Sequence, residues 1–204
     1  MISFSFPTQM IDILLRGTMI FLLLFWHGYW KYSERHADKQ RPKTAGHLKK
    51  YSLQWFARCI LTTLYFLLPL QLMGFSIFPF SAQTPGQLLG LLLALFGFFL
   101  SVWARKALGV NWAHAAEYQV KKKQELITRG IYHYVRHPIY TGIACMLIGS
   151  ELVAKSWLWF FLMPLLFVGA YLQGKREEKL LVSHFGDEYK NYMKRSKMLV
   201  PFVY

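Results

Sequence analysis

Charged residues are scarce in this sequence of 204 residues: Asp, Glu, Lys and Arg make up 17% of it, whereas 54% of the residues are hydrophobic. A soluble domain of this size carries more charged and fewer apolar residues. The composition therefore argues against a soluble protein. It favours a chain whose helices lie in a lipid bilayer, where each helix satisfies its own backbone polar groups.

Cysteine pairs and nucleotide-binding glycine motifs are also lacking. The two cysteines, Cys59 and Cys145, lie in apolar segments and match no metal or redox spacing, so we expect no disulfide. No G-x-G-x-x-G sequence occurs, which argues against the dinucleotide fold and the usual soluble methyltransferase fold. His133 and His137 are spaced like helical zinc ligands, but Pro138 interrupts such a helix, and we expect no metal.

Long apolar blocks separated by short charged segments predict an all-α, polytopic membrane protein. We expect about five transmembrane helices, a cytoplasmic loop and an amphipathic C-terminal tail, which lies on the membrane surface or folds back over the helix ends. The last two helices are predicted to form a short hairpin, since each block is shorter than the roughly 20 residues that a full crossing needs. The blocks lie at residues 11–30, 53–73, 87–103, 139–153 and 156–172.

The net charge of +14 is distributed unevenly along the chain. Residues 31–50, 104–137 and 174–204 each hold seven Lys or Arg, or 21 of the 24, whereas residues 74–86 hold none. Because basic loops stay in the cytoplasm, five crossings place the N-terminus outside and the C-terminus in the cytoplasm. This topology explains the positive charge without a nucleic acid partner, and it adds an attraction to anionic membrane lipids.

The segment GIYHYVRHPIYTG, residues 130–142, places Arg136 and His137 at the mouth of an apolar helix. Pro138 suits the first turn of a helix and pushes His137 out of the α region. The unpaired N–H groups of that turn, together with the two basic side chains, predict an anion-binding pocket at the cytoplasmic face. The alternative is a snorkelling arginine beside a belt of interfacial tyrosines.

A second polar group, Glu177 and Glu178, follows the fifth apolar block. Acidic residues so close to the hydrocarbon are costly and usually have a partner. If the fifth helix returns alongside the fourth, one of these glutamates faces Arg136. Such a pocket suits a zwitterion, with the arginine taking a carboxylate and a glutamate taking an ammonium group. The alternative is a purely structural Arg–Glu pair.

These motifs make the last hundred residues resemble the isoprenylcysteine carboxyl methyltransferase family. Members carry G-x-Y-x-x-x-R-H-P-x-Y-x-G, then E-E-x-x-L, then F-G-x-x-Y-x-x-Y and a proline near the C-terminus. The matching residues here are Gly130, Tyr132, Arg136, His137, Pro138, Tyr140, Gly142, Glu177, Glu178, Leu181, Phe185, Gly186, Tyr189, Tyr192 and Pro201.

The resemblance implies an integral membrane methyltransferase that binds S-adenosylmethionine between the last two helices and the tail. Residues 1–204 would form one membrane domain, in which residues 1–104 supply three helices and residues 105–204 form the cofactor-binding half. We expect catalytic roles for Arg136 and Glu177. The expected cofactor-binding residues are Tyr132, His137, Pro138, Tyr140, Gly142, Glu178 and His114.

The methyl acceptor is less constrained, because the N-terminal helices match no prenyl-recognition motif. We expect carboxyl O-methylation of an isoprenylcysteine-like, lipophilic substrate that enters from the bilayer. The five expected crossings are fewer than in eukaryotic members of the family and closer to the compact prokaryotic members, from which we expect a prokaryotic inner membrane. The alternatives are a membrane N- or S-methyltransferase of a lipid or small molecule, and a non-catalytic lipid-binding membrane protein.

Overall fold

The computed structural model describes residues 6–38, 66–75, 78–80, 84–112 and 125–200. Within these ranges the chain is helical and forms no strands, only two isolated β-bridges. The named elements are α1 (Phe6–Asp38), α3 (Thr84–Leu108), η1 (Gly109–Asn111), η2 (Gly130–His133), α4 (Pro138–Val153), α5 (Leu158–Phe185) and α6 (Asp187–Arg195).

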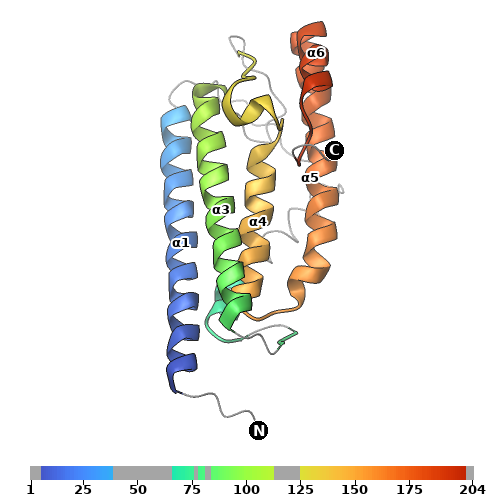
Figure 1. Cartoon of the computed structure of the whole chain (residues 1–204). Helices are drawn as coiled ribbons and strands as arrows, with labels where there is room; N and C mark the ends of the chain where they lie inside the picture. Colours follow the sequence, from blue (N-terminus) through green and yellow to red (C-terminus); the bar gives the residue numbers. More distant parts are fainter. Residues whose placement is uncertain (1–5, 39–65, 76–77, 81–83, 113–124, 201–204) are drawn as a thin grey trace.

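The long helices stand side by side in an up-and-down arrangement (Figure 1). α1 and α3 run in the same direction, α4 returns along α3, and α5 runs back again. η2 and α6 lie at the end where α3 finishes at Leu108 and α4 begins at Pro138, which we call the site end. The opposite end, near Thr84 and Val153, is called the distal end.

Among the described residues, three helices are long and apolar enough to cross a membrane: residues 8–36 of α1, all of α3 and all of α5. Large apolar side chains on these helices face outward, including Phe21, Leu92 and Phe161, each more than 60% exposed. Outward apolar side chains are expected where helices contact lipid rather than water. α4 is shorter, at 16 residues, and more of its side chains are covered by neighbouring helices.

The structure confirms helices in the first, third and fourth predicted blocks, and it corrects the fifth. α5 does not end near residue 172 as half of a short hairpin but continues for 28 residues to Phe185. Residues 175–181, KREEKLL, are strong helix formers, so nothing interrupts the helix where the polar sequence begins. In the second block, residues 66–72 are helical, and residues 53–65 lie outside the described residues.

The length of α5 explains how it can carry glutamates. At 1.5 Å per residue its 28 residues span about 42 Å, more than the roughly 30 Å hydrocarbon core. The last turns therefore reach the polar headgroup region at the site end, where Glu177 and Glu178 lie.

α3 and α4 approach each other closely because glycines line their contact. A Cβ atom added to Gly97 would lie 2.3 Å from the carbonyl oxygen of Gly142, and one added to Gly149 would lie 2.4 Å from that of Gly90. Small residues allow helix backbones to pack this tightly in membranes, where dispersion contacts drive association. The contact fixes α4, and with it the first turn that follows Arg136 and His137.

A polar network joins the helices at the distal end. The amide of Gln87, which is 1% exposed, donates to Asp12 at 2.5 Å and to the carbonyl oxygen of Val153 at 3.0 Å. Asp12 also lies 2.9 Å from the ammonium of Lys155 and 3.1 Å from the guanidinium of Arg16. Residues of α1, α3 and the end of α4 are thereby tied together.

Replacement of Gln87 by leucine should destabilise the folded protein by about 1–3 kcal/mol, because it leaves a buried carbonyl oxygen and one Asp12 contact without a donor. Thermal unfolding of the detergent-purified variant measures the effect. Leu89→Ala, at a 61% exposed position on the same helix, is the control and should change stability less. An unchanged melting temperature for Gln87→Leu would show that the network contributes little.

Candidate functional site

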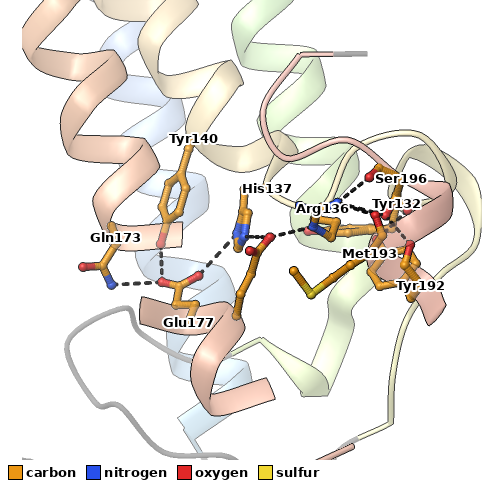
Figure 2. Close-up of polar contacts among 10 residues, drawn as sticks. Tyr132, Arg136, His137, Tyr140, Gln173, Glu177, Tyr192, Met193 and Ser196 are labelled. Carbon is orange, nitrogen blue, oxygen red and sulfur yellow. Dashed lines mark hydrogen bonds and ion pairs between the residues drawn. The ribbon is translucent and has the colours of Figure 1, made fainter. Parts of the chain in front are cut away.

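The chain reaches the site through a turn and a non-helical residue. Gly130 begins η2 with a φ of +64°, a left-handed conformation that favours glycine. His137 then precedes α4 with φ −124° and ψ 55°, and Pro138 occupies the first turn of the helix, as predicted. This backbone directs the side chains of Arg136 and His137 toward the C-terminal part of α5 (Figure 2).

Basic and acidic side chains alternate at this point in a line that we call the polar row: Arg136, Glu178, His137 and Glu177, followed by Tyr140. Figure 2 shows this line from Arg136 through His137 and Glu177 to Tyr140. Arg136 Nε lies 2.6 Å from Glu178 Oε1, which confirms the expected pairing of this arginine with a glutamate of the next helix. His137 lies between the two glutamates, with Nε2 3.6 Å from Glu178 and Nδ1 3.5 Å from Glu177. The Tyr140 hydroxyl donates to Glu177.

Two further contacts hold the Tyr140 end of the polar row. The rings of Tyr140 and His137 are stacked, with centroids 5.6 Å apart and planes at 13°. The amide of Gln173 donates to Glu177 Oε1 at 3.0 Å. Since Gln173 precedes Glu177 by one helical turn, α5 supplies the carboxylate together with the group that orients it.

The polar row is buried yet keeps open hydrogen-bonding capacity. The side chains of Arg136, His137 and Glu178 are 8%, 7% and 3% exposed. Within the described part of the chain, His137 Nε2 and Glu178 Oε2 are buried and have no hydrogen-bond partner. Buried polar atoms without partners are rare because each costs about 1–3 kcal/mol. These two atoms are therefore candidates for contact with a polar ligand.

The C-terminal strap, residues 196–199, pairs with the segment that carries Arg136 and His137. The backbone N–H of Arg136 donates to the Lys197 carbonyl at 2.8 Å, and that of His137 donates to the Met198 carbonyl at 3.0 Å. Nη1 of Arg136 donates to the carbonyl oxygens of Met193, at 3.2 Å, and of Ser196. The tail thus folds back over the helix ends, the second of the two predicted arrangements.

α6 and the strap are fastened by side-chain hydrogen bonds as well. The Tyr192 hydroxyl donates to the Tyr132 carbonyl at 2.5 Å, and the Thr141 hydroxyl donates to the Leu199 carbonyl at 2.7 Å. Burial raises the pKa of Tyr192 to about 12, so its hydroxyl keeps the donated proton at neutral pH. These bonds make the C-terminal residues part of the site's framework.

Two residues expected to bind cofactor make no side-chain contact with the polar row. The Tyr132 ring packs in an apolar cluster with Trp112, and its hydroxyl donates to the Ala104 carbonyl at 3.3 Å. Gly142 faces α3, where an added Cβ would lie 2.9 Å from the backbone nitrogen of Ser101. Both residues were assigned by motif, and tertiary packing turns them toward α3 instead of the polar row.

Of the other predicted residues, Pro138 is buried as the first residue of α4. His114 lies outside the described residues. Sequence reasoning did not predict the hydrogen bond of Gln173 to Glu177 or the individual contacts of the strap with Arg136 and His137. The spacing of Gln173 and Glu177 by four residues could have indicated their hydrogen bond. The strap carries no such signal, because it bonds mainly through its backbone.

Folding stability should depend on the protonation of His137. Burial lowers the pKa of His137, but the carboxylates of Glu177 and Glu178 outweigh burial and raise it above the ordinary value. Because the pKa of His137 is raised by folding, its protonated ring stabilises the folded state. This stabilisation is fully present below a pH of about 6.5 and is lost as the pH rises through the folded-state pKa.

We therefore expect the melting temperature to fall as the pH is raised from about 6.5 into the alkaline range. His137→Gln should flatten this dependence. His184→Gln, at an exposed position near the end of α5, should keep it. If the melting temperature of His137→Gln still falls as the pH is raised, a group other than His137 causes the pH dependence.

The fold and the polar row define the class of protein: an integral membrane protein whose last helices hold a buried ionic site at one end. Residues 86–188, half of the chain, match the family model described as phospholipid methyltransferase. The chain belongs to the phospholipid methyltransferase family.

Curated relatives match a little more than half of the chain. The protein-S-isoprenylcysteine O-methyltransferase of Schizosaccharomyces pombe is 32% identical over 108 residues, which cover 52% of this chain and 46% of the relative. That of Homo sapiens is 30% identical over 115 residues, covering 56% of this chain and 40% of the relative. The chain thus spans about half the length of the curated relatives it matches.

A solved structure shares the fold over nearly the whole chain. The eukaryotic intramembrane Ras methyltransferase, isoprenylcysteine carboxyl methyltransferase, matches with a TM-score of 0.63 and 20% identity, covering 95% of this chain and 68% of the other. At this identity the match shows a common fold. The resemblance predicted from the motifs is confirmed by the family match, the curated relatives and this structure.

Proposed function

We propose that the protein is an S-adenosylmethionine-dependent methyltransferase that O-methylates the carboxylate of a lipophilic, isoprenylcysteine-like acceptor at the membrane. The observation that carries the proposal is the polar row, which offers alternating positive and negative groups in a buried place at the membrane face. The names of the curated relatives support the reaction and the class of acceptor.

The residues present fit the methionine end of S-adenosylmethionine, which is a zwitterion. Nε and Nη1 of Arg136 are already engaged by Glu178 and the tail, so Nη2 and His137 Nε2 would take the carboxylate. Glu178 Oε2 would accept from the ammonium group. His137 Nε2 and Glu178 Oε2 would thereby each gain a partner of complementary charge.

A bound S-adenosylmethionine would supply the methyl group: its S–CH₃ bond would break, leaving the electron pair on sulfur, as a carboxylate oxygen of the acceptor formed the new O–CH₃ bond. A carboxylate acceptor has a pKa of about 3.5–4 and is ionised at neutral pH, so the protein supplies no general base. The chain contributes by aligning the reactants and by excluding water. Burial of Arg136, His137 and Glu178 supports this role.

Membrane placement completes the proposal. We place the site end and the C-terminus in the cytoplasm and the N-terminus outside, an orientation that the positions of the basic segments support. The small number of predicted crossings favours a prokaryotic inner membrane. The acceptor would enter from the bilayer, because its lipid tail partitions there. Residues 105–204 would hold the cofactor, and residues 1–104 would complete a single membrane domain.

A second candidate is N-methylation of a phospholipid amine, which the description of the family model favours. An amine must lose a proton before or during attack. His137 or Glu177 would have to accept that proton. The carboxylate and amine reactions therefore differ in their need for a base, and their products differ in lability to alkali.

Calorimetry on the detergent-purified protein with added lipid tests the cofactor, and transfer of labelled methyl groups tests the acceptor. We expect S-adenosylmethionine to bind and a farnesylated cysteine with a free carboxylate to be labelled as an alkali-labile ester. The same compound with its carboxylate already esterified is the matched control and should take no label.

Alkali-stable label on phosphatidylethanolamine instead would establish the amine reaction. If S-adenosylmethionine does not bind, the protein is no methyltransferase, and the polar row is a structural ion network. Binding without transfer to any acceptor of either class would favour a non-catalytic membrane protein.

A further inference from the structure

Gly174 leaves a space on α5 that two other parts of the chain occupy. An added Cβ would lie 2.5 Å from Met198 Cε and 3.1 Å from both Cδ2 and Nε2 of His137. Gly174 stands one helical turn before Glu178, on the same face of α5. A side chain at position 174 would therefore compete for space with the strap and with the central residue of the polar row.

The position of Met198 is set by the backbone of the strap. Its carbonyl oxygen accepts from the N–H of His137, and the next carbonyl, of Leu199, accepts from Thr141. The Met198 side chain is 3% exposed. The strap thus anchors Met198 to the beginning of α4 and places its side chain against α5.

The His137 ring needs such support because its hydrogen bonds do not hold it tightly. Its nitrogens lie 3.5 and 3.6 Å from the two glutamates, at or beyond the limit of a hydrogen bond. Tyr140 stacks on the ring, and the glycine of α5 with the Met198 methyl lies beside its Cδ2–Nε2 edge. Packing contacts therefore determine where Nε2 points.

We propose that Met198, whose side chain packs against Gly174, is a positioning residue that holds the His137 imidazole in line with Glu178. The inference rests on the proposed function, since the alignment serves the cofactor site. Met198 acts through His137 and needs no contact of its own with the cofactor. The C-terminal strap is then an indispensable part of the site, although none of the family's motif residues lies within it.

The test compares two glycines of the same helix. Gly169 has no atom within 4 Å of an added Cβ, so Gly169→Ala is a matched control for the helix propensity that alanine adds. We expect Gly169→Ala to bind S-adenosylmethionine as the wild type does. Gly174→Ala should weaken binding about tenfold, because the new methyl displaces Met198 and shifts the His137 ring.

A double-mutant cycle identifies the partner. Met198→Ala should weaken binding by roughly fivefold through a loosened His137, and Met198→Leu should restore it, since leucine has a similar volume. In the Met198→Ala background, Gly174→Ala should no longer weaken binding, because its methyl group enters the vacated space. Melting temperatures without cofactor show which variants are folded.

The outcomes separate the two proposals. Wild-type protein that does not bind S-adenosylmethionine contradicts the proposed function, and the present inference falls with it. If the wild type binds, equal affinities for Gly174→Ala and Gly169→Ala overturn only the inference. Additive losses from Gly174→Ala and Met198→Ala would overturn it too, because they would show that the two positions do not interact.

Discussion

Replacement of Arg136 by alanine is expected to weaken S-adenosylmethionine binding at least about 100-fold, because truncating one partner of a buried, hydrogen-bonded charge pair across a binding interface costs about 2–5 kcal/mol. The substitution leaves the carboxylate of Glu178, 3% exposed, without its 2.6 Å partner. It also removes the Nη2 donor proposed for the cofactor carboxylate. Calorimetry with the purified variant in lipid-supplemented detergent measures the change.

Arg136 also holds the tail, so loss of binding has to be separated from loss of structure. The double variant Arg136→Ala with Glu178→Gln removes the unpaired charge and should recover part of the melting temperature without recovering binding. Arg136→Lys keeps the charge but cannot reproduce the separate Nε and Nη1 contacts, and we expect intermediate affinity. Wild-type affinity in Arg136→Ala would reject this arginine as a ligand-binding residue.

Replacement of Gly97 by leucine is expected to destabilise the protein by about 3 kcal/mol or more, at the upper end of overpacking costs. Even its Cβ would lie 2.3 Å from the carbonyl oxygen of Gly142 and 2.8 Å from the backbone nitrogen of Met146. Because these are backbone atoms of α4, no side-chain rotation relieves the overlap. α3 and α4 must separate, and Tyr140 moves with α4.

Thermal unfolding in detergent measures this loss, and cofactor binding should disappear with the fold. Gly28→Leu is the matched control, since Gly28 lies in α1 and an added Cβ there would have no atom within 4 Å. A Gly97→Leu variant as stable as Gly28→Leu would mean that α3 and α4 do not rely on close glycine contact.

Several parts of the site were predictable because their signals are local. Pro138 marks the first turn of α4. Glu177 and Glu178 indicate a basic partner, because a carboxylate so close to the hydrocarbon is costly unless it is paired. Antiparallel return of the fifth helix brings that partner, Arg136, within reach. The same reasoning could not choose between the two glutamates. The structure pairs Arg136 with Glu178 and gives Glu177 to His137, Tyr140 and Gln173.

By itself, the sequence determined that the protein is helical and membrane-embedded, and that an ionic site lies at the start of α4. Short segments suffice for this, because hydropathy, helix-start residues and the cost of a charge near the hydrocarbon can each be evaluated locally. Only the tertiary structure decided where each side chain of the motif points. Tyr132 and Gly142 turn toward α3, the C-terminal strap covers Arg136, and Met198 fits against Gly174. These outcomes depend on backbone hydrogen bonds and close packing between segments distant in sequence, and no local pattern encodes them.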